Sequence, residues 1–139
     1  NDFNRCRFLR WNNTSNEECG YYVGRNPKTW RSPEEYRYDK QSEKVDVYSM
    51  GNVLYVILTG MKPFYQLRDV STDKEIQKAI IRGRRPHIPD IFLNSGDEST
   101  DAVVRAIKKC WIDPPNSRAT AVEIRDGLFK ALNEYQSKN

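Results

Sequence analysis

Hydrophobic residues are most concentrated in one stretch, residues 43–64, with the sequence EKVDVYSMGNVLYVILTGMKPF. From position 45 to 58 they fall on almost every side of a helix, which is typical of a helix buried all round rather than one lying on a surface. Gly60 and Pro63 then mark its end. A buried strand over residues 53–58 is the alternative, because β-branched residues are frequent there, but the length of the whole run favours a helix.

Further helices are expected on both sides of this core helix. Pro33 can open a short one. Thr72 with Glu75, and Thr120 with Glu123, have the spacing of a capping box, in which the two side chains bind backbone N–H groups at a helix start. Another helix is expected from about residue 100 to 111. The last helix carries apolar residues at helical spacing, namely Ile124, Leu128, Ala131, Leu132 and Tyr135.

The remaining segments are polar or interrupted by Gly and Pro. Residues 1–11 predict a turn that leads into a short strand, and residues 14–28 predict a mobile surface loop. Residues 84–89 contain Pro86 and Pro89 and predict an extended segment. The pattern as a whole indicates a mainly α-helical domain.

The length of 139 residues predicts one domain, and a charged content of 30% with a net charge of +4 indicates a polar surface. We expect no nucleic-acid partner, because there is no basic motif interleaved with aromatic residues. No signal peptide or membrane span is recognisable, since about ten uninterrupted apolar residues are too few to cross a bilayer, which needs roughly 20. The chain opens on Asn1 rather than Met, so we expect a fragment of a longer protein.

The three cysteines, Cys6, Cys19 and Cys110, are widely spaced and include no Cys-x-x-Cys pair. With a single histidine in the chain, a structural zinc site is not expected, and free thiols in a reducing compartment are the default. That histidine, His87, is interpreted as a structural or surface residue.

Four separated motifs point to a known family. They are Asp2-Phe3-Asn4, Ser32-Pro33-Glu34, Asp46-Val47-Tyr48-Ser49-Met50-Gly51, and residues 110–118 with the sequence CWIDPPNSR. Each motif is weak or moderate alone, but their joint order and spacing over nearly the whole chain is similar to the C-terminal lobe of eukaryotic protein kinases. The Cys-Trp-x-Asp-Pro stretch most resembles tyrosine kinases and tyrosine-kinase-like Ser/Thr kinases, and the choice between these hydroxyl specificities stays open.

This resemblance implies a kinase-like helical lobe around a buried central helix, with the N-terminal lobe missing. Residues 1–34 would be the activation segment, and residues 35–139 the helical lobe. In the family, the Asp-Phe pair lies against ATP and its Mg²⁺, so Asp2 is implied as a metal ligand and both Asp2 and Phe3 as cofactor-binding residues. Asn4 stands where the family has Gly.

The resemblance also implies structural roles for three residues. Asp46 would hydrogen-bond the backbone of the catalytic loop, although an Asp in the first turn of a helix is also explained by the helix dipole alone. Glu34 would form a buried ion pair with Arg118, since a buried charge must be paired and Arg can grip a carboxylate with two parallel hydrogen bonds.

Two sets of residues are implied for substrate and for regulation. Residues 28–31 (Lys28, Thr29, Trp30 and Arg31) would shape the pocket beside the acceptor hydroxyl. Thr14, Ser15, Tyr21 and Tyr22 are candidate phosphorylation sites, whose phosphate could pair with Arg5, Arg7 or Arg10. The alternative is an ordinary solvated loop beside a solvated basic strand.

The parent domain implied here transfers the γ-phosphate of ATP to a Ser/Thr or Tyr hydroxyl of a protein substrate. The catalytic loop and the ATP lobe are not in this sequence, so no catalytic residue is assigned and the chain alone is expected to be inactive. A catalytically dead kinase homologue that acts as a scaffold, or a helical protein-interaction module, is the alternative. A cytoplasmic location is expected, or the cytoplasmic side of a membrane if the parent is a receptor-like kinase; membrane attachment stays open.

Overall fold

A computed structural model of the chain describes residues 6–138. These residues form a mainly helical domain, as predicted, with one short hairpin. The order of elements is β1 (Trp11–Asn12), β2 (Glu17–Glu18), α1 (Pro33–Arg37), α2 (Lys44–Thr59), the 3-10 helix η1 (Tyr65–Leu67), α3 (Asp73–Ile81), α4 (Asp90–Leu93), α5 (Glu98–Cys110), the 3-10 helix η2 (Pro115–Ser117) and α6 (Ala121–Lys138).

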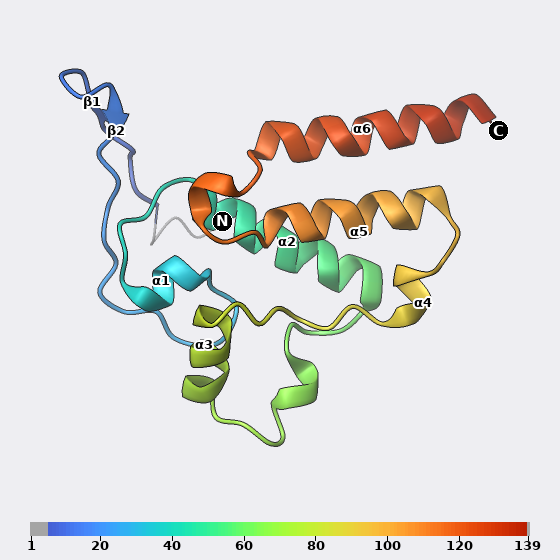
Figure 1. The fold of residues 1–139 in the computed structure, drawn as a ribbon, viewed down its shortest axis with the longest axis horizontal. Coiled ribbons are helices and arrows are strands. Elements are labelled where there is room, and N and C mark those ends of the chain that lie inside the picture. Colours follow the sequence, from blue (N-terminus) through green and yellow to red (C-terminus); the bar gives the residue numbers. More distant parts are fainter. Residues whose placement is uncertain (1–5, 139) are drawn as a thin grey trace.

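The predicted core helix is α2, and it ends at Gly60 in the left-handed conformation, as its sequence indicates. It packs along α5, and α6 packs on the other side of α5 (Figure 1). Gly51 allows the approach of α2 to α5, since a Cβ atom at this position would lie 2.6 Å from the Cβ atom of Cys110. The main hydrophobic core lies between α2 and α5 and includes Tyr55, Ile107 and Trp111.

The prediction that this helix is buried all round is wrong for the described chain. Val53 is 53% exposed and Ile57 is 74% exposed. The reason is that α5 and the segment before α4 cover one side of α2, and no described element covers the side that carries these two residues. The apolar face of α6 is likewise half open, since Leu132 and Tyr135 are exposed.

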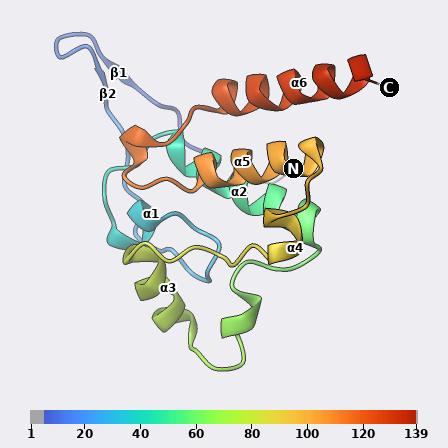
Figure 2. The ribbon, with the colours of Figure 1, turned by 45° about the vertical axis from the view of Figure 1, so that its right-hand side comes forward.

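A second, smaller cluster lies on the opposite side of α2 from α6. There α1 packs on α3, and the buried side chains are Tyr36, Phe64, Ile76 and Ile80. In Figures 1 and 2, both helices lie below the α2–α5 pair. This cluster supports the loop that precedes α1.

The N-terminal part of the described chain forms a projecting hairpin, and the short strand expected within residues 1–11 corresponds to β1, which begins only at Trp11. β1 and β2 pair antiparallel, with Trp11 opposite Glu18. The turn is fastened by the side chain of Asn12, whose Oδ1 accepts hydrogen bonds from the backbone N–H groups of Thr14 and Ser15. Figure 2 shows the hairpin extending away from the helices, which explains why almost all of its side chains are exposed.

Both predicted capping boxes are present. Thr72 caps α3 with Glu75, and Thr120 caps α6 with Glu123. Helix α5 begins at Glu98 rather than near Thr100, because the carboxylate of Asp97 caps it by accepting a 2.7 Å hydrogen bond from the Thr100 N–H. Among residues 6–138, no helix has the length and apolar character that crossing a membrane requires.

Candidate functional site

The segment from Asn26 to Arg37, called here the braced segment, is held to the helical core by a buried ion pair. Arg118 donates from Nη1 to Oε1 of Glu34 at 2.6 Å and from Nη2 to Oε2 at 3.1 Å. The side chains are 0% and 2% exposed, respectively. The predicted pairing is therefore present, and its geometry is the parallel two-bond arrangement of a guanidinium and a carboxylate.

Arg118 makes three other contacts at the same time, two of them with α2. Its Nε donates to the carbonyl of Ile112 at 2.9 Å, and its Nη1 also donates to the carbonyl of Lys44 at 2.7 Å. The guanidinium carbon lies 5.2 Å from the centre of the Tyr48 ring, a cation–π distance. This one side chain therefore joins α1, the first turn of α2 and the loop after α5.

The start of α1 is fixed by a capping box inside the braced segment. Glu35 is buried, and its Oε2 accepts hydrogen bonds from the backbone N–H and the hydroxyl of Ser32, each at 2.9 Å. Its other oxygen accepts from Nη1 of Arg31 at 3.0 Å. A second buried carboxylate in the short helix is thus fully neutralised, which burial of a charge requires.

The loop before α1 is held through its backbone. The Tyr36 hydroxyl donates to the carbonyl of Lys28 at 2.6 Å and accepts from the backbone N–H of Arg31 at 3.2 Å. Gln77 on α3 donates to the same Lys28 carbonyl at 2.7 Å. Burial raises the pKa of Tyr36 to about 12, so its hydroxyl stays protonated and can donate at neutral pH. The buried Asn26 amide donates to the Glu35 carbonyl at 2.5 Å.

Asn52 on α2 links the braced segment to the core. Its Nδ2 donates to the carbonyl of Trp30 at 2.8 Å, and its Oδ1 accepts from the indole N–H of Trp111 at 3.1 Å. Asn52 is buried, so neither bond can be replaced easily by water. The position of Trp30 therefore depends directly on α2 and α5.

A further ion pair fastens the end of α1. Arg37 binds Asp113 with two hydrogen bonds, at 3.0 Å from Nη1 and 3.1 Å from Nη2. The neighbouring guanidinium holds the pKa of Asp113 below its usual value. Both ends of α1 are thus tied to the loop that follows α5.

The four residues predicted to shape an acceptor pocket lie together on the braced segment, but they differ in exposure. Thr29 is buried, and its hydroxyl accepts from Nη2 of Arg68 at 3.4 Å. Lys28 is exposed, with a left-handed φ of 63°, and Trp30 and Arg31 are half-buried. Any contact of Thr29 with a substrate side chain would therefore be limited, while the other three residues stay accessible.

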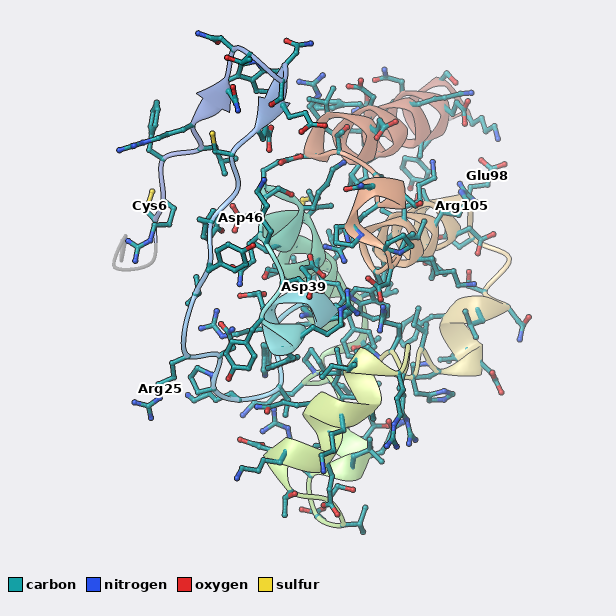
Figure 3. All side chains as sticks on the ribbon, turned by 60° about the vertical axis from the view of Figure 1, so that its left-hand side comes forward. Cys6, Arg25, Asp39, Asp46, Glu98 and Arg105 are labelled. Carbon is teal, nitrogen blue, oxygen red and sulfur yellow. The ribbon has the colours of Figure 1, made fainter. Side chains whose placement is uncertain are left out.

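Asp46 occupies the first turn of α2, where Figure 3 shows it at the N-terminal end of the helix. It is exposed, and among residues 6–138 no group donates a hydrogen bond to its carboxylate. Partial desolvation, together with the nearby charges of Glu35 and Glu43, raises its pKa. The predicted role of Asp46 as an anchor for the catalytic loop stays a prediction.

The candidate phosphorylation sites lie in and after the hairpin. Thr14 and Ser15 are exposed at its turn, and Tyr22 is 71% exposed. Tyr21 is half-buried, and its backbone pairs with that of Gln41 at 3.0 and 2.8 Å. Exposure of the first three is compatible with modification, and Tyr21 is the least accessible of the set.

The predicted cofactor and metal residues, Asp2 and Phe3, lie outside the described residues, as do Asn4 and Arg5. Among residues 6–138, no cluster of three or more His, Cys, Asp or Glu side chains could hold a metal ion. The three cysteines are free, with Cys6 and Cys19 exposed and Cys110 buried. Burial raises the pKa of the Cys110 thiol to about 11, so it is protonated at neutral pH.

Several residues that position the braced segment were not identified from the sequence. Asn26, Tyr36 and Asn52 act through backbone carbonyls, which leave no trace in a pattern of residue types. Arg37 and Asp113 carry opposite charges but are separated by 76 positions, so their pairing has no local signal. The one available signal was Asn52 itself, a polar residue inside an otherwise apolar run, because a buried amide needs partners.

Comparison with known proteins gives a consistent result. Residues 1–129 match the family described as protein kinase domain. The chain is 40% identical over 102 residues, 72% of its length, to a Dictyostelium discoideum protein named probable serine/threonine-protein kinase roco5, of which this match covers 4%. It is 29% identical over 137 residues, or 99% of the chain, to 7% of a putative serine/threonine-protein kinase/receptor of Acanthamoeba polyphaga mimivirus.

A third relative is named after a different enzymatic activity. The chain is 31% identical over 122 residues, 86% of its length, to guanylyl cyclase C of Sus scrofa, and the match covers 11% of that protein. The chain thus spans between 4% and 11% of the length of these three relatives.

Proposed function

The chain belongs to the protein kinase domain family, and from this premise we propose that it is the C-terminal part of a domain whose parent transfers the γ-phosphate of ATP to a protein hydroxyl. The observation that carries the proposal is the buried pair of Glu34 and Arg118. Phosphoryl transfer relies mostly on positioning and electrostatic stabilisation, so a substrate-facing segment must be held rigidly. The bracing contacts of residues 26–37 provide that rigidity.

In this proposal, residues 1–34 are the activation segment and residues 35–139 the helical lobe. Exposed Lys28 and half-buried Trp30 and Arg31 would line the place where the acceptor side chain binds. Their backbone is fixed by Tyr36, Asn52 and Gln77, which favours a preformed surface over one that orders on binding.

ATP and Mg²⁺ would be held mainly by parts of the parent domain outside this chain. The one contribution assigned here is Asp2, a carboxylate of the type that Mg²⁺ prefers, with Phe3 beside the nucleotide. When bound, Mg²⁺ neutralises negative charge on the phosphates. Asp46, whose carboxylate accepts no hydrogen bond from residues 6–138, would hold the backbone of the catalytic loop.

Regulation by phosphorylation is proposed for the exposed residues Thr14, Ser15 and Tyr22, with Tyr21 as a weaker candidate. A phosphate here would carry about two negative charges and could pair with Arg7 or Arg10 in the segment that leads into the hairpin. Such pairing would order the hairpin against the rest of the chain.

The proposal is tested with the parent protein purified from its own source or expressed in full. We expect transfer of labelled phosphate from ATP to a generic protein substrate, loss of transfer in Asp2→Asn, and a large reduction in Glu34→Gln. The exposed control Glu134→Gln should keep full activity. The chain alone should transfer none.

A non-catalytic, partner-binding homologue is the second candidate. Two observations favour it: Asn4 stands where the family has Gly, and one relative is a guanylyl cyclase. If the folded parent transfers no phosphate in the presence of ATP and Mg²⁺, while Glu34→Gln still weakens its folding, this second candidate replaces the first.

A further inference from the structure

A groove lies on the helical lobe, between α5 and the extended segment that leads from α3 to α4. In Figure 1 this segment runs beneath α5 before it enters α4, and Figure 2 gives the same arrangement. The groove has a volume of about 370 Å³. Its lining, which defines the name basic groove used below, consists of Arg85, Pro86, His87, Ile88, Leu93, Lys108, Trp111 and Ile112.

The floor and one rim of the basic groove are apolar. Trp111 and Ile88 are buried beneath it, and Leu93 and Ile112 are each 37% exposed. Apolar walls with a few fixed polar groups are typical of ligand-binding depressions, and the volume suits one or two side chains of a bound peptide.

Arg85 presents a fixed positive charge in this groove. Its Nε donates to the Trp111 carbonyl at 2.8 Å, and its Nη1 donates to the carbonyls of Ile80 at 3.1 Å and Arg84 at 2.9 Å. Its guanidinium carbon lies 5.5 Å from the centre of the Tyr48 ring. Among residues 6–138, no carboxylate forms an ion pair with Arg85 and no group accepts from its Nη2. The guanidinium is therefore oriented by neutral groups and keeps donors for an anion.

The surroundings of the basic groove strengthen the positive charge. Lys108 lines it and is exposed near the end of α5. Residues 82–93 and 105–113 carry two acids, Asp90 and Asp113, against the six cations Arg82, Arg84, Arg85, Arg105, Lys108 and Lys109. Asp113 is paired with Arg37 and also interacts electrostatically with Arg85. Within residues 6–138, none of the six cations forms an ion pair. Such a field favours an acidic ligand, because it accelerates encounter and selects against basic ones.

We propose that the basic groove binds an acidic peptide segment of a partner protein. A Glu or Asp carboxylate of that segment pairs with Arg85 and Lys108, and a neighbouring apolar side chain packs over Ile112 and Leu93. No residue that lines the basic groove belongs to the braced segment, and the proposal does not depend on phosphoryl transfer by the parent.

The burial of Trp111 argues against a nucleic-acid ligand. Single-stranded nucleic acids are bound by exposed aromatic rings on which bases stack. Here the ring is 5% exposed and its N–H is already used by Asn52, while the exposed walls are aliphatic. A peptide with an aliphatic and an acidic side chain matches this lining better.

The test uses the 139-residue chain and a fluorescein-labelled peptide, Glu-Glu-Leu-Leu-Glu-Glu, in an anisotropy titration at low salt. We expect saturable binding that Lys108→Glu weakens by at least about tenfold, because it replaces attraction by repulsion. Lys109→Glu is the matched control. It makes the same charge change at the next position of α5, outside the groove lining, and should change the affinity by less than about twofold.

Two control peptides test the acidic and the apolar contacts of the proposal separately. Replacing all Glu by Gln should abolish binding, and replacing both Leu by Ser should weaken it by about fivefold or more. Variant folding is checked by circular dichroism, and Ile112→Ser offers a second groove variant if Lys108→Glu does not fold. Equal affinity for the two Lys variants, undiminished binding of the Gln peptide, or no binding up to about 1 mM would overturn the proposal. So would competition by an RNA oligonucleotide that binds more tightly than the peptide and is itself weakened by Lys108→Glu.

Discussion

The carboxylate of Glu34 and the guanidinium of Arg118 meet in the interior of the protein although 84 positions separate them in the chain. Their bidentate contact, at 2.6 and 3.1 Å, fixes the short helix α1 against the first turn of α2 and the loop after α5. Because Arg118 also donates to two backbone carbonyls, its removal would disturb more than one element.

Removal of Glu34 should therefore lower the stability of the domain strongly. Glu34→Ala leaves the Arg118 charge buried without its carboxylate, and we expect a loss of about 3–5 kcal/mol in the free energy of unfolding. Urea denaturation followed by circular dichroism measures it. Glu134→Ala is the control, since it breaks an exposed pair with Lys130 at 3.9 Å and should cost at most about 0.5 kcal/mol. An unchanged melting temperature for Glu34→Ala would contradict the structural role of the pair.

Asn52 should be the most sensitive amide in the core. Asn52→Ala removes the partners of both the Trp30 carbonyl and the Trp111 indole N–H, and a buried polar group left without a partner costs about 1–3 kcal/mol. Denaturation monitored by tryptophan fluorescence reports the loss and the change around both rings. Asn133→Ala, on the exposed face of α6, should leave stability nearly unchanged. Equal effects of the two substitutions would show that the Asn52 bridge contributes nothing specific.

Two glycine substitutions should act in opposite directions. A Cβ atom at Gly51 would lie 2.6 Å from that of Cys110 and 3.0 Å from the Trp111 ring, so Gly51→Ala must push α2 and α5 apart. Overpacking of this kind costs about 1–3 kcal/mol. At Gly127 on α6 no atom lies within 4 Å of the added Cβ, and Gly127→Ala should stabilise the domain by about 0.5–1 kcal/mol. Thermal unfolding of the two variants measures both changes in stability. A stabilising effect of Gly51→Ala would contradict the close packing of α2 and α5.

Low pH should destabilise the N-terminal turn of α6. The backbone N–H and the hydroxyl of Thr120 donate to the Glu123 carboxylate and hold its pKa below the usual value. A lowered pKa in the folded state means that the contribution to stability is present above the unfolded-state pKa of about 4.3, and is lost as the pH falls through the folded pKa.

Carboxyl-detected NMR titration of Glu123 checks this pH dependence. We expect its midpoint to lie below that of a Glu in an unstructured peptide and to rise in Thr120→Ala, which removes the hydroxyl donor. Thermal melts at pH 6 and at about pH 3 should show that Glu123→Gln is destabilising at the higher pH and much less so at the lower. A Glu123 midpoint unchanged by Thr120→Ala would exclude the hydroxyl as a cause.

The sequence by itself predicted the helices α1, α2, α3, α5 and α6 and several of their ends, but not the short helix α4. Thr72 and Thr120 placed two helix starts through contacts within four residues, and Gly60 placed the end of α2 through its left-handed conformation. These are local interactions, so residue types at a fixed short spacing are enough to predict where these helices start or end. The four kinase-like motifs also predicted the family, and the resemblance to that family predicted the pairing of Glu34 with Arg118.

The tertiary structure decided what depends on distant neighbours. Whether an apolar residue of α2 is buried depends on which helices lie beside it, and this is why Val53 and Ile57 are exposed although the apolar run predicted burial. The bonds of Asn52 and of Tyr36 go to backbone carbonyls on other elements, and every residue type offers the same carbonyl. Which carbonyl is reached is set by the packing of α1, α2, α3 and α5, and not by a spacing in the chain.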